Sequence, residues 1–188
     1  DAAMQFVPDS GKPKHDDSSA ALSQEIEALR ERLRVSEIFD PVTGLPNRAQ
    51  FLERFGAEYR RAVRFDHPLS VVMMKIRGYV HLLSNRGEEA VETVMCALAT
   101  MCEAASRTGI DIPARYDTAE LAVVLPETPL APALLFTDRL RDLVSRTPVS
   151  LASGMVRLGV RLAAETIVPD DKGPQDSIAR ARRTIGGE

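Results

Sequence analysis

The residues of most chemical interest lie in a short hairpin. Positions 114–126 have the pattern of two short strands, and the tight turn between them reads Asp117-Thr118-Ala119-Glu120-Leu121. Glu120 is a lone carboxylate on this turn. Such a carboxylate is more often solvated or salt-bridged than it is a ligand, and we expect Glu120 to behave in this way.

Two other pairs of residues have chemical potential. Arg107 and Asp111 precede the hairpin, and in isolation they indicate a surface arginine beside an aspartate. Cys96 and Cys102 lie six residues apart in a helical pattern, so their side chains do not share a face. This spacing suits neither a disulfide nor a metal site, and it predicts two reduced core thiols of a cytoplasmic protein.

Length and charge restrict the class of protein. The 188 residues are enough for one domain with an appendage. The net charge of -3, from 24 basic and 27 acidic side chains, gives no strong field for nucleic acid, so we expect no nucleic-acid partner. No apolar run approaches the ~20 residues of a membrane span. We therefore expect this piece, which begins at Asp1, to be cytoplasmic and to lack a membrane anchor.

The N-terminal region divides into two parts. Residues 1–19 contain too little apolar surface to offset the entropy of ordering, which predicts a disordered linker. Residues 20–39 are predicted to form a helix whose apolar stripe has coiled-coil spacing, and this stripe consists of Leu22, Ile26, Leu29 and Leu33. The stripe either joins two copies in a stalk that relays a signal or folds back onto its own domain.

The rest of the chain alternates helices and strands. A turn at 40–48 precedes a helix predicted to bury Phe51, Phe55, Tyr59 and Val63. A strand at 68–77, a helix at 88–106 and the hairpin follow, then a helix around 134–144 and a strand at 149–156. Residues 160–167 fit either a strand or a helical turn, and a short basic helix at 177–184 closes the chain. This order predicts an α/β sandwich with helices packed on a sheet.

Several of these segments resemble the GGDEF family of diguanylate cyclase domains. The resemblance is carried by Asp40-Pro-Val-Thr-Gly-Leu-Pro-Asn-Arg48 followed by Phe51, and it continues through the strand at 69–74, the hairpin and Val149-Ser-Leu-Ala-Ser-Gly154. It covers about 40–156 well, and a helix leading into the 40–48 turn is common in the family. It implies a nucleotide-cyclase-like fold for 40–188, with a central mixed or antiparallel sheet flanked by helices. Active members condense two GTP molecules into cyclic di-GMP across a dimer.

The resemblance also implies where two metal ions would bind, and there the sequence departs from the family. Lys75 stands at the position of one metal-binding acid, and Ala119 occupies the second within the turn. An ammonium ~4 Å from a metal ion is opposed by several kcal/mol at an intermediate dielectric. Asp117 and Thr118 replace two glycines that let the substrate approach. We therefore expect a degenerate domain with no metal and no other cofactor.

Positions that would contact nucleotide diverge in the same way. Leu83 replaces an asparagine that would bind guanine, and Glu92 falls at the second guanine contact. Arg182 matches a phosphate-binding lysine, although the glycine-arginine-asparagine that would follow it is absent. In the family's product-binding motif, Asp111 keeps its place while Arg107 stands one residue early.

Three functions remain open. The first is a non-catalytic regulatory module that forms a homodimer through the N-terminal helix, or contacts a protein partner, and transmits an input from an upstream sensor. The second is an effector that binds cyclic di-GMP through Arg107 and Asp111, or binds GTP or another triphosphate without metal through Lys75 and Arg182. The third, an active cyclase, is disfavoured by Lys75 and Ala119.

Overall fold

The computed structural model describes residue 22, residues 24–28 and residues 38–186. The chain divides into two compact units, Asp1–Val35 and Ser36–Glu188. In the first unit residues 24–28 are helical, and the side chains of Leu22 and Ile26 are exposed. Leu29, Leu33 and the predicted linker at 1–19 lie outside the described residues.

The second unit is built on an antiparallel sheet of four strands in the order β2-β3-β1-β6. Their bounds are β1 (Leu69–Ile76), β2 (Ile112–Asp117), β3 (Glu120–Pro126) and β6 (Val160–Thr166). β1 is central and almost entirely buried, as its continuous apolar run predicts. The segment whose structure was ambiguous in the sequence, 160–167, is therefore mostly strand, and it pairs with β1.

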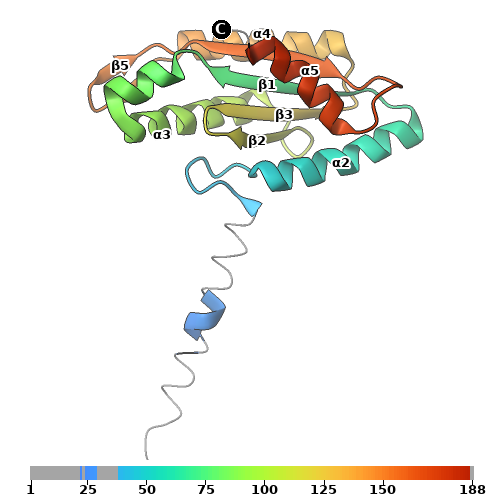
Figure 1. Cartoon of the computed structure of the whole chain (residues 1–188), viewed down its shortest axis with the longest axis horizontal. Helices are drawn as coiled ribbons and strands as arrows, with labels where there is room; N and C mark the ends of the chain where they lie inside the picture. Colours follow the sequence, from blue (N-terminus) through green and yellow to red (C-terminus); the bar gives the residue numbers. More distant parts are fainter. Residues whose placement is uncertain (1–21, 23, 29–37, 187–188) are drawn as a thin grey trace, which may run out of the picture. The chain divides into compact units, whose positions relative to one another are not determined.

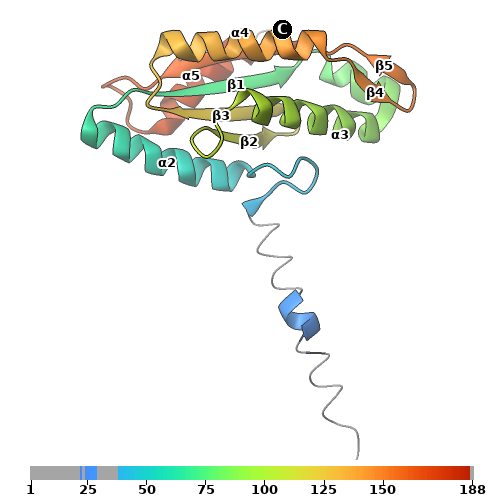
Figure 2. The same cartoon turned by 180° about the vertical axis from the view of Figure 1, so that it is seen from behind.

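Helices cover both faces of this sheet. Their bounds are α2 (Arg48–Phe65), α3 (Tyr79–Ala105), α4 (Leu130–Arg146) and α5 (Pro174–Gly186). One core joins α3 and α4 to Val72 and Met74 of β1, and the other joins α2 and α5 to Val71 and Met73. Figure 1 shows α5 in front of the sheet, and Figure 2 shows α3 and α4 in front of the opposite face. The predicted sandwich of helices on a sheet is confirmed.

Local sequence features explain several boundaries. The side chain of Asn47 accepts a hydrogen bond from the backbone of Gln50 and so caps α2, and Asp66 ends α2 in a left-handed conformation. Phe51 and Phe55 are buried as predicted. Val63, however, is 61% exposed, because Ala62 takes the buried position at that turn of the helix.

Two other predicted elements need correction. The helix predicted at 88–106 is present as the part of α3 that follows Gly87, but the sequence analysis missed the preceding helical segment, which begins at Tyr79 and is separated from it by the non-helical conformation of Gly87 (φ 79°). The strand predicted at 149–156 is a hairpin of two short strands, β4 (Val149–Leu151) and β5 (Gly154–Val156). Gly154, with φ 113°, follows the reversal between them.

The cysteines are free, as their spacing predicts. Burial, with a smaller contribution from Glu103, raises the pKa of the Cys102 thiol to about 12. The half-buried Cys96 donates its thiol hydrogen to the carbonyl oxygen of Val42 (2.9 Å). In the described part of the chain, no helix has the length and apolar character that a membrane span requires.

Candidate functional site

The turn between β2 and β3 is held from within by an arginine. Arg115 Nε donates to the carbonyl oxygen of Asp117 (2.8 Å), and Arg115 Nη2 donates to that of Thr118. Burial lowers the pKa of Arg115, and nearby charges such as that of Asp40 oppose this effect. The Thr118 amide donates to Asp117 Oδ1 (2.8 Å), so side chains occupy the turn where the family has glycines.

The fold brings together Lys75 and Ala119, the two positions at which the resemblance implies metal ligands in active members of the family. Lys75, at the end of β1, lies directly opposite Glu120 of β3. The amide of Ile76 donates to the carbonyl oxygen of Ala119 (3.1 Å), which joins the turn to the same end of β1. Sequence and structure thus place Lys75, Ala119 and Glu120 in one neighbourhood.

Glu120 is paired with an arginine of α5. Its side chain is 8% exposed, and Arg182 Nη2 donates to Glu120 Oε1 (3.2 Å). Arg182 Nε lies 2.9 Å from Glu120 Oε2; this contact is an ion pair that lacks the alignment of a hydrogen bond. Arg182 Nη2 is also 3.5 Å from Asp117 Oδ2. Glu120 is thus salt-bridged within the domain, which is one of the two states that the sequence analysis expected for it.

Tyr116 supports this arrangement from β2. The guanidinium of Arg182 lies 5.3 Å from the centre of the Tyr116 ring, and that of Arg48 lies 4.9 Å from it. The ring itself packs edge-on against Phe51 in the core. Arg182 is therefore held by an aromatic ring as well as by two carboxylates.

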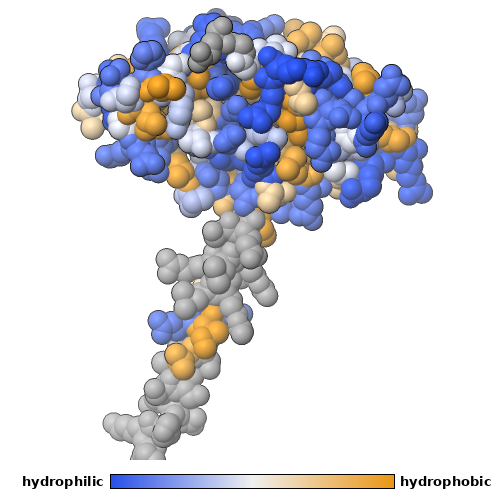
Figure 3. Space-filling model, viewed as in Figure 1, coloured by the Kyte–Doolittle hydropathy of each residue, from blue (hydrophilic) through white to orange (hydrophobic). Residues whose placement is uncertain are grey.

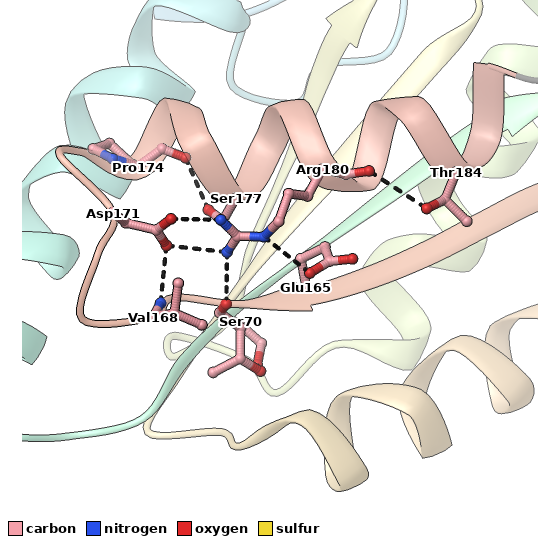
Figure 4. A network of polar contacts seen from close by, with 9 residues as sticks. Ser70, Glu165, Val168, Asp171, Pro174, Ser177, Arg180 and Thr184 are labelled. Carbon is pink, nitrogen blue, oxygen red and sulfur yellow. Dashed lines mark hydrogen bonds and ion pairs between the residues drawn. The ribbon is translucent and has the colours of Figure 1, made fainter.

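A second network of hydrogen bonds and ion pairs links α5, the helix that carries Arg182, to β6 and to the loop between β6 and α5 (Figure 4). Arg180 contacts both carboxylate oxygens of Asp171, at 2.5 and 3.0 Å, and also donates to Glu165 (3.2 Å) and to the carbonyl oxygen of Thr166 (2.9 Å). Tyr59 of α2 donates to the backbone oxygen of Asp171 (2.6 Å). The sequence analysis did not identify Arg180 or Asp171, because their pairing depends on the path of the loop between β6 and α5.

The predicted guanine positions lie on α3, on either side of its kink. Leu83 is 38% exposed and precedes Gly87, whereas Glu92 follows it and is also exposed. Within residues 38–186, Glu92 makes no hydrogen bond or ion pair that would hold it toward the turn.

The Arg107–Asp111 pair forms a separate, self-contained site. Arg107 Nε and Nη2 contact Asp111 Oδ1 at 3.0 and 2.6 Å, and Nη2 also donates to the carbonyl oxygen of Pro126 and to Thr128. The hydrogen bonds that Arg107 donates to the carboxylate of Asp111 are the main reason that the pKa of Arg107 is raised. Both residues line a pocket of about 230 Å³ that also includes Phe136 and Arg139. The sequence analysis missed Arg139, which reaches this pocket from α4.

Comparison with known proteins gives a consistent result. The family described as "Diguanylate cyclase, GGDEF domain" matches residues 37–184. The response regulator PleD of Caulobacter vibrioides is 29% identical over 164 residues, which are 80% of this chain and 36% of PleD. The chain therefore spans about a third of the length of this curated relative.

Two solved structures show the likeness of the fold. Diguanylate cyclase SiaD of Pseudomonas aeruginosa, in complex with its activator SiaC, has a TM-score of 0.74 and 24% identity, covering 92% of this chain and 65% of SiaD. The coiled coil and GGDEF domain of DgcB from Caulobacter crescentus, in complex with c-di-GMP, has a TM-score of 0.77 and 18% identity, covering 91% and 90% of the two chains. At these identities the likeness concerns the fold alone.

Proposed function

The chain belongs to the GGDEF family of diguanylate cyclase domains, and we propose that it is a non-catalytic member that acts as a regulatory or protein-interaction module in cyclic di-GMP signalling. The scaffold supports this proposal because the strands and helices of the second unit bury two hydrophobic clusters, one on each face of the sheet. A folded domain without catalytic groups is suited to binding another protein and changing that protein's behaviour.

One observation carries the proposal: cationic and methyl side chains occupy the place of a two-metal site. Phosphoryl transfer between nucleotides needs metal ions to neutralise the triphosphate and to activate the attacking hydroxyl. Lys75 offers an ammonium, Ala119 offers no donor, and the carboxylate of Glu120 is paired with Arg182. These residues do not fit a pair of divalent ions.

The test is incubation of the protein with GTP and Mg²⁺ or Mn²⁺, followed by chromatography of the products. We expect no cyclic di-GMP, because neither ion has a complete set of ligands. Formation of cyclic di-GMP by the purified chain would contradict the proposal.

We further propose that the module pairs with a second copy through the N-terminal helix, in addition to contacting a partner or an upstream sensor. The exposed side chains of Leu22 and Ile26 support this, as does the presence of a coiled coil in DgcB and of a protein activator bound to SiaD. A Leu29→Ser, Leu33→Ser chain should sediment as a monomer while its far-UV circular dichroism keeps the domain's signal. A dimer of unchanged stability would place the association surface elsewhere.

A second candidate function is binding of cyclic di-GMP, and the pocket beside Arg107 favours it. Arg107 Nη1 makes no hydrogen bond within residues 38–186, and Arg139 lines the same pocket, so two cationic groups are available to a phosphate. The volume of about 230 Å³ is below the ~300 Å³ at the lower end for small-molecule sites, so this pocket suits only part of the ligand.

Calorimetry with cyclic di-GMP distinguishes this candidate from a purely protein-binding module. If the pocket binds the ligand, an Arg139→Gln variant should bind at least about tenfold more weakly than the unmodified chain, a loss of about 1.4 kcal/mol. No heat at tens of micromolar protein would remove this candidate.

A further inference from the structure

β6 lies at the edge of the sheet, and one of its sides faces away from the other strands. Among the strands that the structure describes, β6 has one neighbour, β1. The amide of Ile167 donates to the carbonyl oxygen of Leu69 (2.9 Å) at one end of this pairing. The amide of Arg77 donates to that of Gly159 (2.8 Å) at the other end. Such bonds alternate along an antiparallel pair, so the odd-numbered residues of β6 turn their N–H and C=O groups toward β1, and the even-numbered residues turn theirs outward.

The outward backbone groups in the middle of β6 are unpaired. Arg180 donates to the carbonyl oxygen of Thr166 (2.9 Å), which agrees with the outward direction of the even-numbered residues. Within residues 38–186, the outward N–H and C=O groups of Leu162 and Ala164 have no comparable partner. An open strand edge of this kind can pair with a strand from another chain.

The side chains of β6 make this edge complementary to a second copy of itself. Arg161, Ala163 and Glu165 project from the face of the sheet where α5 packs. If two copies of β6 run antiparallel with Ala163 opposite Ala163, Arg161 of each copy lies opposite Glu165 of the other. The same register sets Leu162 opposite Ala164, so the outward backbone groups meet. The neighbouring registers that keep these hydrogen bonds put Arg161 opposite an alanine or an isoleucine instead.

Both charged side chains have capacity for such a contact. In the described part of the chain, Arg161 has one long contact, from Nη1 to the carbonyl oxygen of Ile185 (3.4 Å), and no acidic partner. Glu165 receives Arg180 Nε on Oε2 (3.2 Å), which leaves Oε1 for a second donor. Opposite charges directly across a strand pair are favourable, and a two-fold axis would form this pair twice.

Exposed apolar side chains of α4 border the same edge. Helical periodicity places Leu130 and Leu134 on one flank of α4 and Arg139 on the other. Arg139 lines the pocket with Arg107, which follows α3, so the flank with the two leucines is the one on the side of β6. These leucines are 45% and 47% exposed. Figure 3 shows hydrophobic residues at the upper margin of the molecule, next to the hydrophilic residues over α5. A second copy bound along β6 would shield such side chains from water.

We propose that β6 pairs with β6 of a second copy of this chain, antiparallel and with Ala163 opposite Ala163. The pairing joins the two four-stranded sheets into one. It is a surface separate from the N-terminal helix and goes beyond the proposed function. One strand edge offers few contacts, so this association is weak: a Leu29→Ser, Leu33→Ser chain should be a monomer at tens of micromolar and should dimerise at near-millimolar concentration.

Exchanging the two charges tests the pairing. The measurement is sedimentation equilibrium at near-millimolar protein in the Leu29→Ser, Leu33→Ser background. Arg161→Glu alone and Glu165→Arg alone should each weaken dimerisation at least about tenfold, because like charges then lie opposite each other. An equimolar mixture of the two variants should recover dimers, because the acidic side chain introduced in one faces the basic side chain introduced in the other. A mixture that stays as monomeric as its components would overturn the inference.

Arg64→Glu is the matched control for these charge changes. Arg64 is exposed on α2, which packs on β2 at the opposite edge of the sheet (Figure 1). It should dimerise as the background chain does. An equal loss of dimer in Arg64→Glu would show that net charge, and not the β6 edge, controls association, and would overturn the inference.

A cysteine substitution tests the register without changing charge. Two cysteines directly opposite each other in an antiparallel pair lie within the range of a disulfide. Oxidised Ala163→Cys should therefore form a covalent dimer on a non-reducing gel. Ala164→Cys should not, because Ala164 lies opposite Leu162. Absence of the Ala163→Cys dimer, or equal cross-linking of both variants, would contradict the proposed register.

The two interfaces fail separately. A Leu29→Ser, Leu33→Ser chain that remains a dimer at tens of micromolar would contradict pairing through the N-terminal helix. Loss of the recovery in the charge-exchanged mixture would contradict only the pairing of β6.

Discussion

Replacing Arg180 with methionine should destabilise the domain by about 3–5 kcal/mol, because it leaves a buried carboxylate without its counter-ion. The side chain of Asp171 is 3% exposed, and Arg180 contacts both of its oxygens. Arg180 also joins Glu165 and the backbone of Thr166 to α5, so methionine removes several hydrogen bonds together. The change should appear as a large shift in the midpoint of chemical denaturation.

Arg183→Met provides the matched control for this prediction. Arg183 lies on the same helix and is exposed, so its loss should change the free energy of unfolding by no more than about 0.5 kcal/mol. If Arg180→Met and Arg183→Met had similar stabilities, the network in Figure 4 would not hold α5 in place.

The same pair gives the stability a defined dependence on pH. The hydrogen bonds from Arg180 are the main cause that lowers the pKa of Asp171 below its ordinary value. An aspartate whose pKa is lower in the folded state contributes stability above its unfolded pKa of about 3.9, and this contribution is lost as the pH falls through the folded pKa. Asp171→Asn should therefore lose stability at neutral pH and show a weaker decline in acid than the unmodified chain.

Replacing Arg182 with methionine should cost about 1–3 kcal/mol. The substitution leaves the buried carboxylate of Glu120 without its cation, and the effect is smaller than for Arg180 because the side chain of Arg182 is 38% exposed to solvent. Denaturation of Arg182→Met measures this cost directly.

A double-mutant cycle separates the ion pair from the loss of packing on Tyr116. Glu120→Gln removes the charge that Arg182 neutralises, so the double variant should be less destabilised than the sum of the two single variants by about 0.5–3 kcal/mol. Additive effects would mean that Arg182 does not stabilise Glu120, and the carboxylate would then be available to another cation.

Much of the fold follows from local patterns in the sequence. The continuous apolar run of β1 predicted a central strand, and the polar turn at Asp117 predicted the hairpin that β2 and β3 form. The motif at 40–48 located the start of α2 correctly, because Asn47 has the geometry that caps a helix. These features depend on neighbours in the chain, so periodicity and turn chemistry are sufficient to predict them.

The errors arise where conformation depends on distant contacts. The sequence analysis missed the first turns of α3, which precede the kink at Gly87, because exposed side chains such as Val80 and Leu83 form no buried apolar stripe there. The resemblance to the GGDEF family assigned Lys75 and Ala119 to the two metal positions of a single site. The sequence therefore predicted that Lys75, Ala119 and Glu120 lie close together. It did not predict the partner of Glu120, because Arg182 reaches it from a helix 62 residues later in the chain.

The GTP turnover assay tests the central claim most directly, with the protein at tens of micromolar and Mg²⁺ and Mn²⁺ supplied in separate reactions. A domain in which Lys75 and Ala119 occupy the metal positions, and Arg182 pairs with Glu120, should yield no more cyclic di-GMP than a protein-free blank. Product that increases in proportion to protein concentration, and that disappears in Glu120→Gln, would contradict the claim.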